Sequence, residues 1–321
     1  MEQLESILIV TRKTALEELV ARFNSRSQAK FYIEQTARQN PHVKSIPFEE
    51  YQNAHDTYHQ SLGSLKDRLP KGIKNQIIDR DFLPSFQFSG KDLVITLGPD
   101  GLVINTAKYL TNEPILALNP DPARIDGVLI PFHMYSAEEV IGIAFQGQAR
   151  IKPVSMAKAK LSDGQALYAV NDLFIGARTH VSARYRLELD GKFEDQSSSG
   201  IIISTGAGST GWLRSIVTGS YQVVGHFASG GTKIPGNNIY RLDWSSPQLV
   251  FAVREPFPSL TSTTGITFGW LGEGKNLVIT SFMSGNGVIF SDGIEADFLQ
   301  FNSGTIATIS LAERSANLIV P

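Results

Sequence analysis

One stretch of the sequence restricts the fold more than any other. Residues 93–97 are continuously apolar and stop at Gly98. Apolar residues at helical spacing follow over residues 102–110, and residues 115–118 are again continuously apolar. Two apolar strands on either side of a helix are typical of parallel strands that are buried on both faces. We therefore predict an N-terminal α/β domain with a parallel sheet, to which residues 7–10 add a first strand.

The second half of the chain has a different pattern. Beyond about residue 135, apolar and polar residues alternate in short segments, as from Tyr185 to Leu189, and turn signals such as Asp190-Gly191 follow them. Further strands are expected at residues 169–175, 200–204, 248–253, 276–281, 287–290 and 305–310. We therefore predict two domains: an α/β domain over residues 1–133, which residues 311–321 rejoin, and a strand-rich domain over residues 134–310.

Two segments lack a strand pattern. Residues 41–87 are polar with scattered aromatic side chains, and we expect helices there. Residues 227–238 are rich in glycine and proline, a composition typical of a loop at a working surface.

Charge and composition exclude several classes of function. The 29 Lys and Arg residues against 31 Asp and Glu residues give a net charge of −2, which lacks the excess of cations that binding to a nucleic acid backbone needs. The absence of cysteine excludes disulfides, thiolate catalysis and cysteine-ligated metals. No apolar run approaches the roughly 20 residues of a membrane helix, and the acidic N-terminus lacks the layout of a secretory signal. We therefore predict a cytoplasmic protein that binds neither nucleic acid nor membrane.

The turn at residues 98–101, Gly-Pro-Asp-Gly, is the first candidate site. It lies where an apolar strand ends and a helix begins, the place where open α/β sheets bind ligands. A carboxylate there, that of Asp100, could orient or deprotonate a hydroxyl group or hold a magnesium ion. The alternative is a plain turn, because Pro, Asp and Gly are also preferred turn residues.

The second candidate is the glycine-rich segment at residues 206–211, Gly-Ala-Gly-Ser-Thr-Gly, which follows apolar residues 201–203. The dinucleotide fingerprint also needs an acid about 20 residues later, and the first acid downstream is Asp243. A P-loop is excluded because no lysine follows the glycines. What remains is a glycine-rich turn whose backbone N–H groups can approach an anion or a ribose.

Two other patterns favour structural roles. Ser209 would need an acid and a histidine after it to act as a hydrolase nucleophile, and residues 210–225 contain no acid. His55 and His59 stand four residues apart, which would place both on one helix face, as in zinc-binding helices. Without a third ligand in the local sequence, a solvated helix face is favoured over a metal site.

Six segments in the same order resemble the NAD kinase family, particularly its mitochondrial-type branch. The resemblance covers residues 90–315. VITLGPDG (94–101) is similar to the family's strand with Gly-Gly-Asp-Gly, and NPDPAR with GVL (119–129) to the branch's Asn-x-Asp-Pro-x-Arg segment. AVNDLFIG (169–176) is similar to the strand with the Asn-Glu motif. SSG leading into TGAGSTGW (198–212) is similar to the second glycine-rich loop, and REP (254–256) and SDG (291–293) complete the series.

The resemblance implies a fold and a reaction. The fold is that of NAD kinases and diacylglycerol kinases, with a Rossmann-like N-terminal domain and a strand-rich C-terminal domain. The reaction transfers the ATP γ-phosphoryl group to the 2′-hydroxyl of NAD, with Mg²⁺, in a homodimer or homotetramer. Asp100 would be the catalytic residue. The residues implied to bind the nucleotides are Gly98, Gly101, Asn119, Asn171, Asp172, Gly208, Ser209, Thr210, Gly211, Trp212 and Ser215.

Three positions depart from the family pattern and leave alternatives open. Pro99 replaces a glycine and removes one backbone N–H, Leu102 replaces a threonine, and Asp172 replaces a glutamate. A nucleotide-binding homologue with impaired catalysis, or a kinase acting on a lipid or sugar hydroxyl, therefore stands beside the NAD kinase hypothesis. The phosphoryl donor, ATP or polyphosphate, and the preference for NAD or NADH also remain open.

Overall fold

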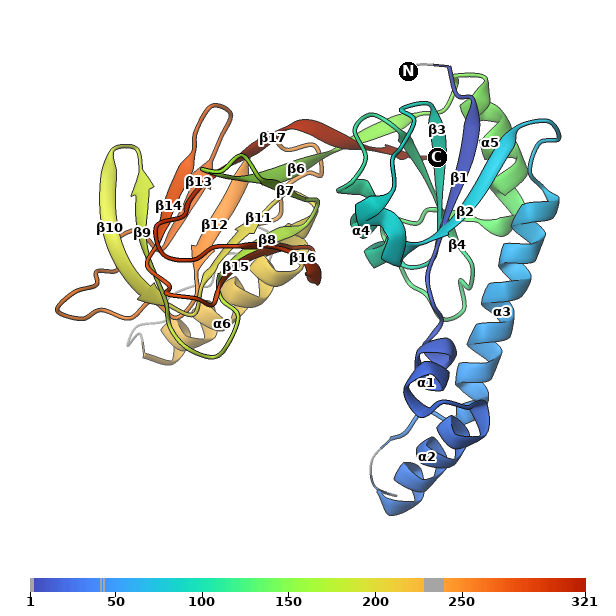
Figure 1. Cartoon of the computed structure of the whole chain (residues 1–321), viewed down its shortest axis with the longest axis horizontal. Coiled ribbons are helices and arrows are strands. Elements are labelled where there is room, and N and C mark those ends of the chain that lie inside the picture. The colour runs from blue at the N-terminus through green and yellow to red at the C-terminus, as the bar shows by residue number, and fades with distance from the viewer. Residues whose placement is uncertain (1–2, 41, 43, 228–239) are drawn as a thin grey trace. The chain divides into compact units, whose positions relative to one another are not determined.

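The computed structural model describes residues 3–40, 42, 44–227 and 240–321, and the chain forms two compact units (Figure 1). Unit 1 comprises Met1–Thr106, Glu113–Ile151 and Leu318–Pro321, and unit 2 comprises Ala107–Asn112 and Lys152–Asn317. The predicted glycine-rich loop at residues 227–238 lies outside the described residues, apart from Phe227.

Unit 1 is built on a parallel sheet in the strand order β2-β1-β3-β4, and a short strand, β5, pairs with β4. Its strands are β1 (Ser6–Thr11), β2 (Lys74–Asp79), β3 (Asp92–Leu97), β4 (Pro114–Asn119) and β5 (Phe132–His133). Every residue of β3 and β4 is buried, as expected for central strands with both faces covered. The structure confirms the parallel α/β domain that the apolar segments predicted.

Helices cover this sheet and extend beyond it. They are α1 (Ala15–Phe23), α2 (Arg26–Gln39), α3 (Phe48–Asp67), α4 (Asp100–Ala107) and α5 (Ala137–Phe145), with 3₁₀ turns at Arg80–Ser85 and Met134–Ser136. Thr14 caps α1 in a capping box with Glu17, whose side chain returns to the Thr14 N–H. Within unit 1, α1, α2 and the first turns of α3 project past the sheet (Figure 1) and share a small apolar cluster around Leu16, Ala29 and Phe48.

The boundary between the units differs from the expected one. It falls between Ile151 and Lys152 rather than after residue 133, because Ala137 and Ile141 of α5 pack into the same core as Leu97 and Leu116. The expected helical region at residues 41–87 is helical only in part. Residues 74–79 form the edge strand β2, whose mostly polar sequence carries no apolar strand signal, and parallel pairing with β1 places it there.

Unit 2 is a sandwich of two sheets. One sheet has the strand order β13-β12-β11-β8-β15-β16, and all its pairings are antiparallel. The other contains β10, β9, β14 and β17 in that order, with β6 and β7 beside them. The strands are β6 (Ile151–Leu161), β7 (Ala166–Ala169), β8 (Asp172–Ala177), β9 (Ala183–Leu189), β10 (Lys192–Ser198), β11 (Ile201–Ser204), β12 (Leu249–Val253), β13 (Phe268–Leu271), β14 (Leu277–Ser281), β15 (Gly287–Ser291), β16 (Ile294–Gln300) and β17 (Ile306–Ile319).

The core of unit 2 lies between these sheets. Leu173 and Ile175 of β8 point into it, opposite Leu187 and Ile279, as strand alternation requires. Phe174 points the other way and packs under α6 (Trp212–Phe227), the helix that covers the outer face of the sheet. None of the helices within the described residues is long and apolar enough to cross a membrane.

Candidate functional site

The first group of candidate residues lies at the carboxyl edge of the unit 1 sheet. Strands β1, β3 and β4 are parallel, so the segments that follow them leave the sheet at the same edge. Gly98 follows β3, and Asn119 is the last residue of β4. The Gly98 N–H donates to the carbonyl of Leu118, which ties the two strand ends together at 3.2 Å.

Asp100 begins α4, and both of its carboxylate oxygens are held by backbone donors. Oδ2 accepts from the N–H of Val128 and Oδ1 from the N–H of Leu129, each at 2.9 Å. Gly127 makes this approach possible, because a Cβ atom there would lie 2.6 Å from the Asp100 Oδ1 and 2.5 Å from Cγ1 of Ile130. Asp100 therefore fixes the loop after β4, while each oxygen retains a further lone pair for a ligand.

Asn119 organises the start of that loop. Its side chain donates to the carbonyl of Ile125 at 2.9 Å and accepts from the N–H of Asp121 at 3.0 Å. Asp121 in turn pairs with Arg124 at 2.9 Å. Asn119 is buried, so its role in this structure is to shape the loop that Asp100 also holds.

A cavity of about 850 Å³ opens at the same edge of the sheet. Gly98 and Pro99 line it, together with Arg12 after β1 and Tyr58 and His55 from α3. Its volume is that of a typical ligand site. Gly101 lies at the exposed first turn of α4, where a Cβ atom would meet nothing within 4 Å.

The second group of candidate residues forms a corner in unit 2, where β7 leads into β8. Asp292 closes the turn between β15 and β16 and organises this corner. Its Oδ1 accepts from the N–H of Asn171 at 2.7 Å and of Asp172 at 3.1 Å, and its Oδ2 accepts from the N–H of Val170 at 2.9 Å. One buried carboxylate therefore fixes the backbone of the Asn-Asp pair.

Asp172 is the electrostatically unusual residue of this corner. The pKa of Asp172 is raised to about 7. Burial is the main cause, a hydrogen bond with Ser204 partly opposes it, and the nearby Asp292 carboxylate adds to the rise. Burial also raises the pKa of Asp292, to about 6. The Asp172 Oδ1 atom is buried and has no hydrogen-bond partner among the described residues. An orphaned buried acceptor of this kind is suited to a donor on a ligand, such as a ribose hydroxyl.

The glycine-rich loop at residues 206–211 packs directly on this corner. A Cβ atom at Gly208 would lie 2.2 Å from the carbonyl oxygen of Asn171 and 2.8 Å from the Asp172 Oδ1. The Thr205 hydroxyl donates to the carbonyl of Val170 and accepts from the N–H of Gly208. The structure therefore brings the loop and the Asn-Asp pair together, and glycine at position 208 permits the contact.

Ser209 is fully buried in this loop. Its hydroxyl donates to the carbonyl of Gly206 at 2.7 Å and accepts from the N–H of Leu242 at 3.2 Å. Both functions of the hydroxyl are used within the protein, which argues against the hydrolase alternative. In this structure Ser209 contributes through the shape of the loop.

The remaining candidates lie on the outer side of the loop and the first turn of α6. Thr210, Gly211 and Ser215 are exposed, and the Ser215 hydroxyl donates to the carbonyl of Gly211 at 3.4 Å. Trp212 stacks on Phe174 with its ring nearly parallel, at 5.9 Å between centroids. These positions leave backbone and hydroxyl groups accessible to a ligand.

Lys108 is a buried charged residue beside this corner that the motifs did not indicate. It lies in the short segment of unit 2 between α4 and β4, and its buried ammonium is 2.6 Å from the Asp297 Oδ2 and 3.1 Å from the Ser291 hydroxyl. Its charge lowers the pKa of Asp292 against the effect of burial. Asp292 belongs to a segment that carried the resemblance. The local sequence Ser-Asp-Gly indicates only a turn, so the sequence did not predict that Asp292 holds the backbone of residues 170–172.

Curated proteins that are similar to this chain are named NAD kinases. A NAD kinase of Clostridium kluyveri is 29% identical over 132 residues, which cover 39% of this chain and 45% of that protein. Human "NAD kinase 2, mitochondrial" is 25% identical over 267 residues, covering 63% of this chain and 60% of the relative. The chain resembles the NAD kinases. It spans about half the length of the first curated relatives it matches, and no protein-family model matches it.

Solved structures of NAD(H) kinases share the fold. A yeast NADH kinase complexed with NADH aligns with a TM-score of 0.56 and 15% identity, covering 100% of this chain and 84% of the other. An NAD kinase from Archaeoglobus fulgidus in complex with ATP aligns with a TM-score of 0.54 and 15% identity, covering 98% and 93% of the two chains. The similarity confirms the predicted fold, an α/β domain followed by a strand-rich domain.

Proposed function

We propose that this NAD kinase-like chain transfers the γ-phosphoryl group of ATP to the 2′-hydroxyl of the adenosine ribose of NAD, giving NADP. The observation that carries the proposal is the corner of unit 2. There Asp292 fixes the backbone of Asn171 and Asp172, and Gly208 packs against that backbone. The Oδ1 atom of Asp172 has no hydrogen-bond donor among the described residues. A carboxylate with a free lone pair is a suitable partner for a ribose hydroxyl.

Asp100 is proposed as the residue that orients or deprotonates the attacking hydroxyl. Phosphoryl transfer depends mainly on positioning and on neutralising charge, so a rigidly held carboxylate is suited to this role. The two backbone donors from Val128 and Leu129 supply that rigidity.

Mg²⁺ is expected to accompany ATP. Within the part of the chain that the structure describes, no three carboxylates lie close enough together to hold a cation. Mg²⁺ commonly binds through substrate phosphates and retained waters, which is compatible with this finding.

The experiment is a direct assay with each donor and acceptor. The purified chain is incubated with ATP or polyphosphate, Mg²⁺ and either NAD or NADH, and NADP or NADPH is measured with a dehydrogenase specific for the phosphorylated cofactor. We expect product with ATP and NAD. Calorimetry that shows NAD binding while no donor gives product would instead support a homologue with impaired catalysis.

That second candidate rests on a specific feature of the loop after β3. Pro99 has no N–H, so the turn that lines the unit 1 cavity offers one donor fewer to a phosphate. A missing charge-assisted hydrogen bond costs about 1.5–3 kcal/mol, or one to two decades in rate or binding. The alternative of a lipid or sugar kinase has less support, because the curated relatives are named NAD kinases.

The affinity for NAD is expected to depend on pH through Asp172. The pKa of Asp172 lies at about 7 in the free protein, above its usual value of 3.8, so its carboxylate forms only as the pH rises through neutrality. A ribose hydroxyl bonds the ionised form more strongly, so affinity should rise about tenfold between about pH 6 and pH 8. Titration calorimetry with NAD alone, at a series of pH values, measures this.

The matched variant is Asp172→Asn, which keeps the shape and removes the titration. Its affinity for NAD should be lower at about pH 8 and nearly independent of pH across this interval. The same rise of affinity with pH in Asp172→Asn would contradict the assignment and would point to another group, of which Asp292, with its pKa of about 6, is the first to test.

The homo-oligomer and the cytoplasmic location stay predictions. Multi-angle light scattering of the purified chain measures the first, with a dimer or a tetramer as the expected mass.

A further inference from the structure

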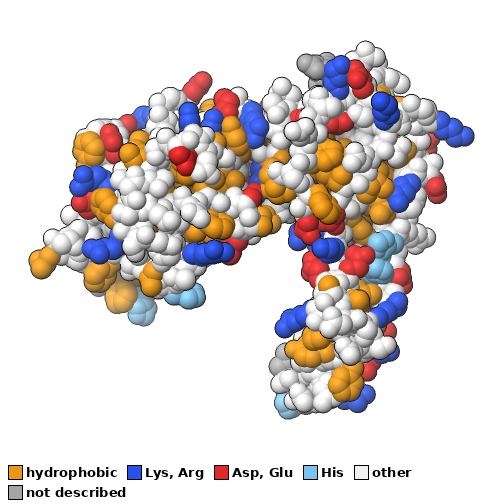
Figure 2. All heavy atoms as spheres, in the orientation of Figure 1, with side chains coloured by type: hydrophobic (Ala, Val, Ile, Leu, Met, Phe, Trp, Pro, Cys, Tyr) orange, Lys and Arg blue, Asp and Glu red, His pale blue; other side chains and the backbone are white. Residues whose placement is uncertain are grey.

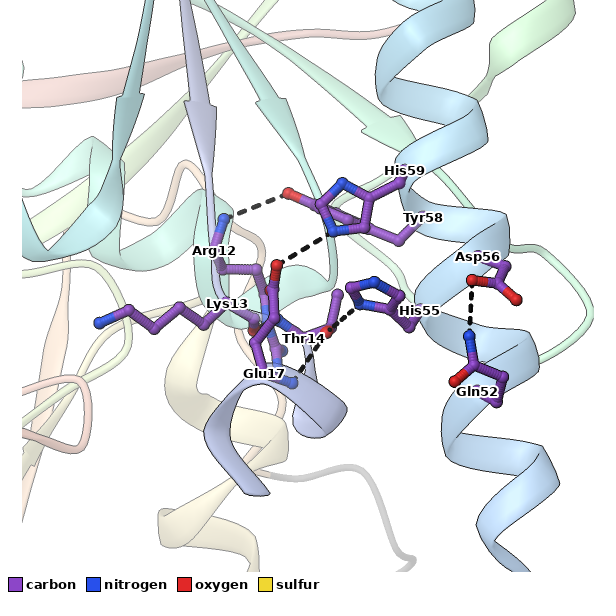
Figure 3. Close-up of polar contacts among 9 residues, drawn as sticks. All are labelled: Arg12, Lys13, Thr14, Glu17, Gln52, His55, Asp56, Tyr58 and His59. Atoms are coloured by element: carbon purple, nitrogen blue, oxygen red, sulfur yellow. Dashed lines mark hydrogen bonds and ion pairs between the residues drawn. The ribbon is translucent and has the colours of Figure 1, made fainter. Parts of the chain in front are cut away.

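The two histidines on α3 that sequence analysis assigned to a solvated face meet a third ligand in the structure. His55 and His59 lie on one face of α3, four residues apart, and their ring centroids are 4.3 Å apart. Glu17 reaches them from the first turn of α1, 42 residues away from His59 along the chain. Figure 3 shows the three side chains pointing toward one another between the two helices.

The donor atoms of this cluster, Glu17, His55 and His59, are close enough to bind one ion. One ring nitrogen of each histidine and one oxygen of Glu17 all lie within 4.8 Å of one another. The His59 Nε2 is already 3.1 Å from the Glu17 Oε1. The ligand atoms around a tetrahedral zinc ion lie about 3.3 Å from one another. Side-chain rotations that move these atoms by about 1 Å would therefore bring them to that spacing.

Neighbouring contacts hold two of the three ligands in place. The Thr14 hydroxyl bonds the Nδ1 of His55 at 2.8 Å, which fixes the orientation of that ring. The other oxygen of Glu17, Oε2, accepts from the Thr14 N–H at 2.7 Å. Metal-binding histidines and carboxylates commonly have such partners, which orient the ligand atoms before the ion arrives.

We propose that Glu17, His55 and His59 form a binding site for a divalent transition-metal ion, with Zn²⁺ as the natural occupant, which joins α1 to α3. Two imidazoles and one carboxylate suit Zn²⁺ and not Mg²⁺ or Ca²⁺, which prefer oxygen ligands. Three protein ligands leave a fourth position open. That position faces solvent, because the side chains of His59 and Glu17 are 44% and 37% exposed.

The placement of the site gives it a structural consequence. Helices α1, α2 and the first turns of α3 are packed by a small apolar cluster of only three buried residues, Leu16, Ala29 and Phe48. A metal cross-link adds most where the apolar core is small. Figure 2 shows histidine and acidic side chains together at the surface beside α1 and α3, where an ion from solvent can reach them. The inference does not rest on the proposed kinase activity.

The test uses the full chain, stripped of metal with a chelator and titrated with ZnCl₂, CoCl₂ and MgCl₂. We expect one Zn²⁺ per chain in calorimetry, a visible absorption band for bound Co²⁺, and no heat from Mg²⁺. Each of three single variants should weaken Zn²⁺ binding by about tenfold to a hundredfold. They are His55→Gln, His59→Gln and Glu17→Gln. Glutamine at position 17 can still complete the capping box of α1, so the fold is retained.

Asp56→Asn is the matched control on the same helix. Asp56 bonds Gln52 at 2.7 Å and points away from the cluster in Figure 3, so its substitution should leave Zn²⁺ binding unchanged. A second measurement is the melting temperature, which Zn²⁺ should raise by several degrees in the unaltered chain and not in His59→Gln. The absence of Zn²⁺ binding by the unaltered chain, or equal binding by the three ligand variants, would overturn the proposal.

Discussion

Replacing Asp100 with asparagine is expected to lower kcat for the phosphorylation of NAD by about 10²- to 10⁴-fold, the usual contribution of a general base. The substitution removes the charge that would take or orient the proton of the 2′-hydroxyl. It keeps the size of the side chain, so KM for NAD should change far less than kcat. Steady-state kinetics with ATP and NAD, each varied in turn, separates the two effects.

A structural effect of the same substitution must be measured alongside. The carboxylate accepts from the N–H groups of Val128 and Leu129, and asparagine offers an acceptor to only one of them. An amide facing the other donor costs about 1–3 kcal/mol. We therefore expect a lower melting temperature as well, while NAD binding measured by calorimetry is retained.

Asp67→Asn is the control for Asp100→Asn. Asp67 is an exposed acid at the end of α3. Its substitution should leave kcat unchanged and should alter the free energy of unfolding by no more than about 0.5 kcal/mol. If Asp100→Asn kept the activity of the unaltered chain, another group would act on the hydroxyl. If it lost activity only where the protein was unfolded, its role would be structural.

Replacing Asp292 with alanine is expected to destabilise unit 2 by about 3 kcal/mol and to abolish NAD binding at micromolar concentrations. The substitution leaves the backbone N–H groups of Val170, Asn171 and Asp172 without their acceptor. Each buried, unsatisfied donor costs about 1–3 kcal/mol, and entry of water recovers part of this. Unfolding in urea measures the free energy, and calorimetry measures the binding of NAD.

The chain contains a close match to serve as the control. Asp190 precedes a glycine in a tight turn, with φ values of 50° and 75° at Asp190 and Gly191, against 55° and 72° at Asp292 and Gly293. Its side chain is exposed, and among the described residues it pairs with Lys275 at the surface. Asp190→Ala therefore carries the same strain at positive φ without the three buried amides. Equal losses of stability in the two variants would show that Asp292 does no more than form a turn.

Sequence reasoning succeeded for the strands and turns that carry many of the candidate residues. The strands at residues 93–97 and 201–203 were predicted because buried strands are continuously apolar, and the observed β3 and β11 contain them. The turn at Asp190-Gly191 was predicted because only a few residue types accept positive φ. The candidates at residues 98–101 and 206–211 followed from glycine-rich turns that end such strands. The other candidates, Asn119, Asn171, Asp172, Trp212 and Ser215, were implied by the resemblance to NAD kinases.

The partners of those residues could not be predicted in the same way. Asp292 lies 120 residues from Asp172, and Val128 lies 28 residues from Asp100. Glu17 and His59 are 42 residues apart, so the local sequence around the histidines gave no third ligand. Strand β2 is another example, because its polar residues carry no periodic signal and its position depends on pairing with β1.

The sequence by itself determined most of the strands, the parallel sheet of unit 1, the strand-rich character of unit 2, and the turns at which many candidate residues lie. These follow from periodicity and turn preferences, which act between residues close together along the chain. Only the tertiary structure decided which carboxylate oxygen has no partner among the described residues, which carboxylate holds three backbone amides, and which residues gather into the cluster proposed to bind a metal ion. Hydrogen bonds and desolvation depend on distances in space, and the fold brings together residues that the sequence keeps far apart.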